Sequence, residues 1–251
     1  MTQCTTSPAL ETPPGIQVDN LGLRFGDKPI FEGLNFTIAG GTFAALLGVS
    51  GTGKTSLLQI IAGLIPPSAG SVSGSDGASL AGRIAWMGQK DLLYPWLTIA
   101  DNIALGARLR GQPVDSPWAE HLLERVGLAG YGQAMPATLS GGMRQRAAIA
   151  RTLYERKPIV LMDEPFSALD AITRTAIQDL AAELLSGNTV LLITHDTMEA
   201  CRLSNHLLVL SRWPGGLDDS HLISGNTPRA PDDPILLKTQ ATLMLQLMGA
   251  Q

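Results

Sequence analysis

The chain has few residues of several kinds that would mark particular classes of protein. Among its 251 residues are two cysteines, Cys4 and Cys201, which are too few and too far apart in sequence for a disulfide framework or a zinc site. Lysine and arginine number 18 against 22 aspartates and glutamates, for a formal charge of −4. Without a basic footprint, nucleic acid is disfavoured as the main ligand, and the few cysteines favour a reducing compartment.

Long hydrophobic runs are also missing. Residues 1–15 are rich in threonine and proline, with no basic start and no apolar run, so no signal peptide is predicted. No stretch approaches about 18 uninterrupted apolar residues, so none is expected to span a bilayer. A content of 45% apolar and 16% charged residues is typical of a globular protein, which we expect to be soluble or peripheral to a membrane.

Apolar periodicity predicts alternating strands and helices. Residues 16–38 alternate apolar and polar residues around a central turn, which predicts a hairpin. Strands are predicted at 43–47, 83–87, 159–162 and 189–194, and helices at 54–62, 140–155 and 171–185. Because the strands are near-continuous apolar runs that alternate with helices, we expect an α/β fold with a parallel sheet buried on both faces.

Three segments depart from this alternation. Residues 68–77 are rich in glycine and serine and are interpreted as a turn region. Residues 90–137 have helical periodicity with breaks at Gly111 and Pro113, which indicates an inserted helical lobe. The tail at 213–251 contains four prolines and then a predicted short helix that carries Leu236, Leu243 and Leu247 on one side.

Residues 48–55 fit the phosphate-binding pattern G-x-x-x-x-G-K-[ST]. In such a loop the backbone N–H groups point inward around phosphate oxygens, and the following helix adds a favourable dipole. Lys54 is expected to reach the β- and γ-phosphates, and the Thr55 hydroxyl to bind Mg²⁺. The predicted contacts of ATP are Gly48, Val49, Ser50, Gly51, Thr52, Gly53, Lys54, Thr55 and Ser56.

Two carboxylates and a histidine follow predicted strands at the carboxyl edge of the sheet, where ligands bind in parallel α/β folds. Asp163 is expected to hold the metal through water, and Glu164 to polarise the attacking water. His195 would donate a hydrogen bond to the γ-phosphate or orient that water. The alternatives are that Asp163 and Glu164 cap the turn before Pro165, and that His195 is a capping or surface residue.

Two further residues are candidates for the same site. Gln89 follows the predicted strand at 83–87, and its carbonyl oxygen can reach Mg²⁺ or the water at the junction with the helical lobe. Phe25 lies in the hairpin and can stack on adenine. As alternatives, Gln89 is a polar loop residue and Phe25 a plain hairpin aromatic.

The segment Leu-Ser-Gly-Gly-Met-Arg-Gln-Arg at 139–146 opens a predicted helix, and such an end presents unpaired N–H groups to an anion. Because the loop at 48–55 already holds the phosphates, this second anion-binding end makes sense if it faces the γ-phosphate held by another copy of the chain. Arg144, Arg146 and Arg151 are interpreted as a solvated or interdomain charged face without a catalytic role.

Together these residues, in this order, resemble the nucleotide-binding subunit of ATP-binding-cassette (ABC) transporters over about 16–210. The resemblance implies a P-loop NTPase (RecA-like) core with a small antiparallel β subdomain and a helical lobe at about 90–150. It implies an ATPase domain at 16–212, between a flexible segment at 1–15 and a short tail at 213–251. In such families two copies dimerise head to tail, so ATP bound by one copy would meet Ser140, Gly141, Gly142, Met143 and Asp170 of the other.

A finer resemblance, over 91–98, 139–150 and 163–174, is to bacterial importer ATPases for nitrate, sulfonate, taurine and thiamine precursors. Residues 80–110 and 178–185 look most like the ATPase proposed for hydroxymethylpyrimidine uptake. The resemblance implies a peripheral subunit on the cytoplasmic face of the inner membrane, bound to permease subunits and served indirectly by a periplasmic or lipoprotein solute-binding protein. Alternatives are import of sulfonate, taurine or nitrate, a soluble cassette ATPase without a membrane partner, and a P-loop kinase or GTPase.

One apolar run has two interpretations. Residues at 92–97 are too apolar for a free surface, so a membrane partner is expected to dock near 89–103. The alternative is that the run forms local core of the helical lobe. Its apolar members are Leu92, Leu93, Tyr94, Trp96 and Leu97.

Overall fold

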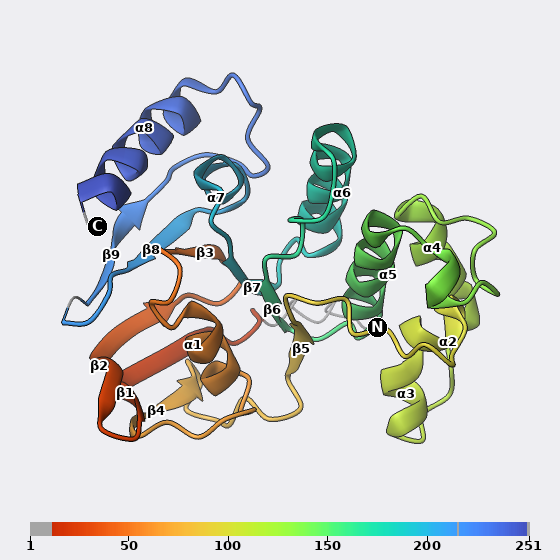
Figure 1. Cartoon of the computed structure of the whole chain (residues 1–251), viewed down its shortest axis with the longest axis horizontal. Coiled ribbons are helices and arrows are strands. Elements are labelled where there is room, and N and C mark those ends of the chain that lie inside the picture. The colour runs from red at the N-terminus through yellow and green to blue at the C-terminus, as the bar shows by residue number, and fades with distance from the viewer. Residues whose placement is uncertain (1–11, 215, 250–251) are drawn as a thin grey trace, which may run out of the picture.

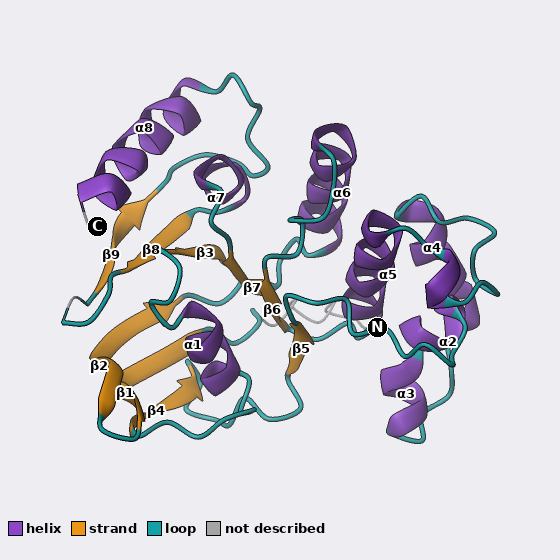
Figure 2. Ribbon diagram, viewed as in Figure 1, coloured by secondary structure: helices purple, strands orange, loops and turns teal. Residues whose placement is uncertain are grey.

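The computed structural model describes residues 12–214 and 216–249, which form a central sheet, a smaller sheet and a helical lobe (Figure 1, Figure 2). Most of the segment expected to be flexible, at 1–11, lies outside the described residues. The strands are β1 (Ile16–Phe25), β2 (Lys28–Ile38), β3 (Phe43–Leu47), β4 (Ala69–Gly74), β5 (Ile84–Met87), β6 (Ile159–Asp163), β7 (Thr189–Ile193), β8 (His206–Leu210) and β9 (Leu217–Leu222). The helices are α1 (Lys54–Ile61), α2 (Ile99–Ile103), α3 (Leu105–Leu109), α4 (Ser116–Arg125), α5 (Gly141–Tyr154), α6 (Ala171–Leu184), α7 (Thr197–Leu203) and α8 (Pro234–Gly249), with a short 3-10 helix η1 (Pro136–Thr138).

The central sheet has the strand order β5-β6-β7-β3-β8-β9, and its neighbouring strands are parallel except for β8 and β9. Every residue of β3, β6, β7 and β8 is buried, because packed layers cover both faces of the sheet. The predicted strands β3, β5, β6 and β7 and the α/β class are confirmed. Helix α7 and strands β8 and β9 were not predicted.

A second sheet, with the order β2-β1-β4, packs over one face of the central sheet and shares a core with α1. The antiparallel pair of β1 and β2 is the predicted hairpin. The interpretation of residues 68–77 as a turn region is wrong, because β4 pairs with β1 and places Val72 opposite Val18. Glycine and serine side chains carry little strand preference, so the pairing with β1 decides the conformation.

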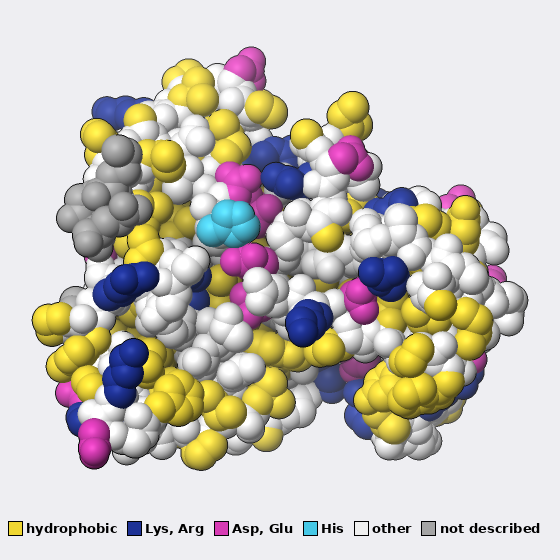
Figure 3. All heavy atoms as spheres, in the orientation of Figure 1, with side chains coloured by type: hydrophobic (Ala, Val, Ile, Leu, Met, Phe, Trp, Pro, Cys, Tyr) yellow, Lys and Arg dark blue, Asp and Glu magenta, His cyan; other side chains and the backbone are white. Residues whose placement is uncertain are grey.

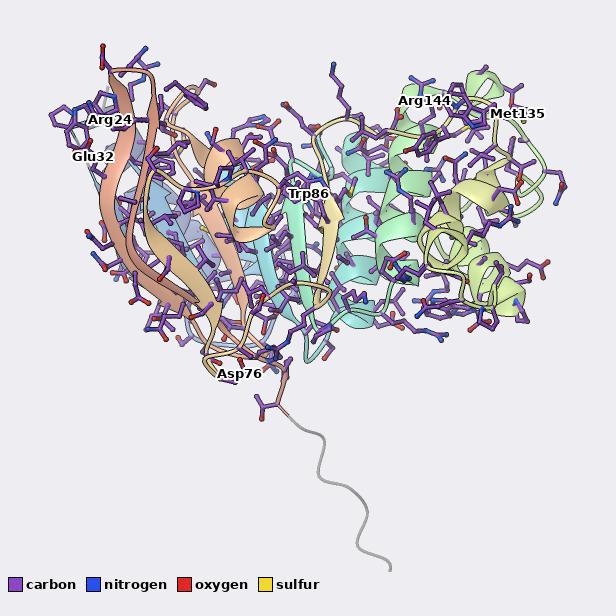
Figure 4. All side chains as sticks on the ribbon, turned by 90° about the horizontal axis from the view of Figure 1, so that it is seen from below. Arg24, Glu32, Asp76, Trp86, Met135 and Arg144 are labelled. Atoms are coloured by element: carbon purple, nitrogen blue, oxygen red, sulfur yellow. The ribbon has the colours of Figure 1, made fainter. Side chains whose placement is uncertain are left out.

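The predicted helical lobe is confirmed, and α2, α3 and α4 stand at one end of the molecule beside α5 (Figure 1). Its apolar side chains share a core with one face of the central sheet. In Figure 4 Met135 and Arg144 lie on the lobe, Trp86 of β5 lies between the lobe and the small sheet, and Asp76 lies at the opposite edge from Arg144. Among the described helices, none has the length and apolar character that a membrane span requires.

The tail is fastened to α7 by a buried arginine. Leu236 and Leu243, predicted to share one side of this helix with Leu247, are buried, and Leu247 is partly buried in the same cluster. The Arg229 guanidinium donates hydrogen bonds of 2.8–3.0 Å to four carbonyl oxygens at the end of α7 and after β9. These oxygens belong to Cys201, Ser204, Ile223 and Ser224. The tail therefore packs as part of the core through polar contacts that the sequence pattern did not reveal.

Replacing Arg229 with methionine is expected to lower the free energy of unfolding by about 2–4 kcal/mol, because buried carbonyl oxygens lose their donors. Urea denaturation followed by circular dichroism measures the change. Lys238→Met removes the same charge from an exposed position of α8 and should change stability by less than about 0.5 kcal/mol. Equal effects of the two substitutions would contradict a special role for Arg229.

Candidate nucleotide-binding site

The loop between β3 and α1 carries the phosphate-binding pattern. Its glycines have positive φ angles, +153° at Gly48, +82° at Gly51 and +95° at Gly53, a region of backbone conformation that favours glycine. A Cβ atom on Gly53 would lie 2.5 Å from Ile30 Cγ2, and one on Gly48 would lie 2.3 Å from the carbonyl oxygen of Leu210. The loop therefore needs glycine at these two positions for both conformation and space.

Lys54, the first residue of α1, reaches back to this loop. Its Nζ donates hydrogen bonds to the carbonyl oxygens of Gly48, at 2.8 Å, and Val49, at 3.1 Å. Burial lowers the pKa of Lys54, and the nearby carboxylates of Glu164 and Asp163 oppose this shift. The loop and the edge of β6 thus hold a cation between them, where the phosphates of a nucleotide would need one.

Asp163 and Thr55 form a pair of oxygen donors beside the loop. The Thr55 hydroxyl donates to Asp163 Oδ2 at 2.8 Å. Burial raises the pKa of Asp163, while this hydrogen bond and Lys54 oppose the shift. Hydroxyl and carboxylate oxygens suit Mg²⁺, which is usually held by one or two carboxylates together with substrate phosphates. The pair fits that pattern. Among the described residues no group of three or more His, Cys, Asp or Glu side chains could hold a metal ion, so Mg²⁺ here would need the phosphates of the nucleotide as further ligands.

Glu164 lies at the centre of a hydrogen-bonded group at the carboxyl edge of the sheet. Its N–H donates to the carbonyl oxygen of Ile193 at 2.9 Å, and its φ of +49° turns the backbone sharply at the end of β6. Gln89 Nε2 donates to Glu164 Oε2 at 3.3 Å, and His195 Nδ1 lies 3.2 Å from Oε1. Non-glycine residues in this conformation concentrate at functional sites. Three residues predicted from separate strand ends are therefore in contact.

Gln89 and Glu164 line a cavity of about 360 Å³, whereas His195 is joined to it only through its contact with Glu164. Phe25 lines the cavity from the end of β1 and is 59% exposed. Figure 3 shows histidine and acidic side chains together near the centre of this face of the molecule. The lining residues are Phe25, Ile30, Ser50, Gly51, Gly53, Lys54, Thr55, Ser56, Gln89, Asp163, Glu164 and Ile193.

Some of the predicted loop residues support the cavity rather than line it. Thr52 Oγ1 donates to the carbonyl oxygen of Val49 at 3.0 Å, which closes the loop internally. Two further residues that no sequence motif indicates also support the loop. Ile30 packs beneath Gly53, and Arg212 donates to the carbonyl oxygen of Ser50 at 3.0 Å. An isoleucine in a strand and an arginine far along the chain carry no local signal of a role in this loop.

The segment expected to meet a partner's ATP lies apart from the cavity. Ser140 caps the N-terminus of α5 by accepting a hydrogen bond from the Met143 N–H at 3.3 Å, and it is exposed, as is Gly141. A Cβ atom on Gly142 would lie 3.4 Å from the carbonyl oxygen of Ala168. This segment therefore packs against the turn that leads into α6.

Asp170 ends the same turn and caps α6. Its carboxylate accepts a hydrogen bond from the Thr173 N–H at 3.0 Å, and hydrogen bonds to that residue lower the pKa of Asp170. Asp170 is exposed and does not line the cavity. Ser140, Gly141, Gly142, Met143 and Asp170 thus lie on neighbouring segments, away from the nucleotide cavity of their own chain.

A family model described as ABC transporter matches residues 31–167, more than half of the chain. The chain belongs to the ABC transporter family. It is 43% identical over 242 residues to an uncharacterised ABC transporter ATP-binding protein of Haemophilus influenzae, covering 94% of this chain and 100% of that protein. It is 41% identical over 250 residues to an aliphatic sulfonates import ATP-binding protein of Burkholderia cenocepacia, covering 96% of this chain and 92% of that protein.

Solved structures agree with this assignment. The fold is similar, with a TM-score of 0.74 and 29% identity, to the dimeric ATP-binding cassette MJ0796 in a post-hydrolysis state bound to ADP and phosphate, covering 84% of this chain and 100% of that one. A putative metal-chelate type ABC transporter in an inward-facing conformation is similar with a TM-score of 0.69 and 25% identity, covering 82% and 83%. The ABC ATP-binding proteins are ATPases, so this chain is an ATPase with the cassette fold.

Two glycine substitutions test the geometry of the loop. Gly51→Ala is expected to cost about 1 kcal/mol of stability through its left-handed conformation alone, because a Cβ there meets nothing within 4 Å. Gly53→Ala should cost about 2 kcal/mol more, since its Cβ would overlap Ile30 and force it to move. Urea denaturation without nucleotide measures both values, and equal losses would contradict the close packing of Gly53 under β2.

Proposed function

We propose that this chain is the ATP-hydrolysing subunit of a bacterial importer, in which two copies close head to tail on two MgATP. The observation that carries the proposal is one cavity that joins the glycine loop, the Thr55–Asp163 pair, Gln89 and Glu164, with His195 in contact with Glu164 at its edge. A P-loop kinase or GTPase would share the loop but would not explain the segment at 139–146. The dimeric state of MJ0796 supports pairing of two copies.

Each residue has a proposed task in hydrolysis. Backbone N–H groups of the loop and Lys54 bind the phosphates, with Phe25 against the adenine. Bound Mg²⁺, held by Thr55 and Asp163 with Gln89 nearby, would supply positive charge that stabilises the developing phosphate charge. Glu164 accepts a proton from the attacking water, oriented by its contact with His195. Ser140 to Met143 and Asp170 complete the site of the other copy.

Replacing Glu164 with glutamine is expected to reduce ATP turnover by about a hundredfold or more, because glutamine cannot accept the proton. The substitution keeps the size of the side chain and the hydrogen bond with Gln89, so an ATP-dependent dimer should accumulate. Single-turnover kinetics and size-exclusion chromatography with and without MgATP measure the two effects. A variant that stays monomeric with MgATP and still hydrolyses it would disprove the two-copy mechanism.

The loop at 91–97 is proposed to bind the membrane permease. Both the docking surface and the local core expected of this run are found in it. Leu93 is buried in the core of the lobe, whereas Leu92, Tyr94 and Trp96 are 58%, 42% and 70% exposed. The Tyr94 and Trp96 rings pack edge to face, 5.2 Å apart. Figure 3 shows hydrophobic side chains gathered over the lobe. Such a concentration of exposed apolar side chains favours a protein partner.

The loop is rigidly built beneath this surface. The buried Asn102 amide accepts from the Tyr94 N–H at 2.7 Å and donates to the carbonyl oxygens of Tyr94, Leu97 and Thr98. Arg144 and Arg151 of α5 bind Asp91 and the carbonyl oxygens of Asp91 and Leu92. These two arginines therefore hold the docking loop to α5, the helix that Ser140 caps, which supports an interdomain rather than catalytic role.

Replacing Tyr94 and Trp96 together with alanine is expected to leave the basal ATPase rate within about twofold, because neither side chain lines the nucleotide cavity. Solute uptake by the reconstituted transporter should fall by about tenfold or more, since truncation of aromatic contacts weakens protein interfaces. Leu93→Ala, from the buried side of the same loop, should instead lower stability. Equal loss of ATPase and transport in the aromatic variant would indicate a core role.

The cargo and the location of the subunit are also proposals. Relatives at 40–41% identity are named for aliphatic sulfonate import, which supports a sulfonate as the solute, whereas hydroxymethylpyrimidine rests on the resemblance at 80–110 alone. We propose a peripheral position on the cytoplasmic face of the inner membrane, with residues 16–212 as the ATPase domain and 213–251 as a tail. Uptake assays that compare an alkanesulfonate with hydroxymethylpyrimidine distinguish the two solutes.

A further inference from the structure

A buried polar cluster lies between α6 and α7, outside the nucleotide cavity. Its members Gln178, Glu199 and Arg202 are 4%, 5% and 7% exposed. Gln178 Nε2 donates to Glu199 Oε2 at 3.0 Å, and Arg202 donates to Gln178 Oε1 at 3.1 Å. Burying three such side chains opposes folding unless every group is paired. Apolar residues would fill the same space without this desolvation cost, so we expect a functional role for the cluster.

The cluster reaches the nucleotide site through the first turn of α7. Asp196 caps this helix by accepting hydrogen bonds from the N–H groups of Met198, at 2.9 Å, and Glu199, at 3.2 Å. Its own N–H donates to Thr194 Oγ1 at 3.0 Å, so the cap encloses His195 between two hydrogen-bonded neighbours. By binding Gln178, the Glu199 side chain therefore holds to α6 the helix whose cap directly follows His195.

A second contact joins the same two segments nearer the surface. Arg174 of α6 lies 3.5 Å from Asp196 Oδ2 and donates to the carbonyl oxygen of Leu169 at 2.9 Å. Asp196 follows His195, and Leu169 precedes Asp170. Helix α6 is thus tied at one level to α7 by Gln178, and at another to Asp196 and Leu169 by Arg174.

We propose that Glu199 and Gln178 are positioning residues for ATP hydrolysis, which hold His195 against α6 and so link its orientation to Asp170 at the start of that helix. This inference rests on the proposed roles of His195 and Asp170. Because Asp170 is expected to meet the other copy, the contact would let closure of the dimer set the histidine in one copy. Neither Glu199 nor Gln178 touches the nucleotide cavity.

The charge of Glu199 changes in the neutral range. Burial raises its pKa to about 7, assisted by the charge of Asp196 and opposed by hydrogen bonds from Thr194 and Gln178 and by Arg174. Arg202 faces the cluster from α7 through Gln178. A raised pKa means that the folded surroundings favour the neutral carboxyl, so ionisation of Glu199 as the pH rises through about 7 should weaken the contact between α6 and α7.

Glu199→Ala and Gln178→Ala are expected to lower kcat about tenfold while the KM for ATP changes less than about twofold, because misorientation costs rate without removing phosphate contacts. Glu199→Gln keeps a carbonyl acceptor and should restore most of kcat, but without the dependence on pH near 7. Glu120→Gln, at an exposed position of α4, is the charge-matched control. Thermal unfolding confirms that each variant is folded at the assay temperature.

Combination with His195→Ala separates this inference from the function on which it rests. If Glu199 acts through His195, Glu199→Ala should add less than about twofold to the loss in His195→Ala, since coupled residues are not additive. Two outcomes would overturn the positioning role alone. In one, the losses of kcat in the two single variants multiply in the double variant; in the other, folded Glu199→Ala keeps its kcat while His195→Ala loses it. An unchanged kcat in His195→Ala would instead overturn the role proposed for the histidine.

Discussion

The register of three adjacent parallel strands is the constraint on which the nucleotide site depends. Leu46 of β3 and Asp163 of β6 both lie opposite Ile193 of β7. All three strands therefore end at one level, and the residues that follow them emerge side by side. The glycine loop, Glu164 and His195 are separated by about 30 to 140 residues of sequence, yet the buried strands place them at one edge. Any slip of register would part the loop from the carboxylates, so the hydrophobic packing that fixes the strands also fixes the chemistry.

Much of this arrangement could be predicted because its signals are local. A buried parallel strand is a short apolar run, and a glycine loop followed by Lys54 and Thr55 has a specific spacing, so β3, β6 and β7 and the loop were found together with Asp163 and Glu164. The same reasoning failed for β4, whose glycine and serine residues carry no apolar pattern and whose conformation comes from pairing with β1. Strand β9 was missed for a related reason, since its polar residues pair with only one neighbour at the edge of the sheet.

The contacts that tune the site could not be predicted, because they join residues without a shared local pattern. Ile30 of the hairpin occupies the space beneath Gly53, and Arg212 binds the loop from beyond β8. Arg229 was an ordinary tail residue in the sequence, and only the fold shows that it closes the end of α7. Long-range hydrogen bonds depend on where side chains meet after folding, whereas motifs and periodicity describe neighbours along the chain.

Two short paths lead from the proposed docking surface, one to Glu164, the proposed base, and the other to the start of α5. Gln89 touches Glu164 and begins the segment whose rigid turn exposes Tyr94 and Trp96. Arg144 and Arg151 hold the same segment to α5, whose first turn carries the residues expected to meet a partner's ATP. A displacement of this loop by a membrane subunit would therefore shift the positions of both Glu164 and Ser140. Because hydrogen bonds to the buried Asn102 amide hold the loop in one shape, it would move as a unit, and a rigid unit transmits such a displacement where a flexible one would absorb it.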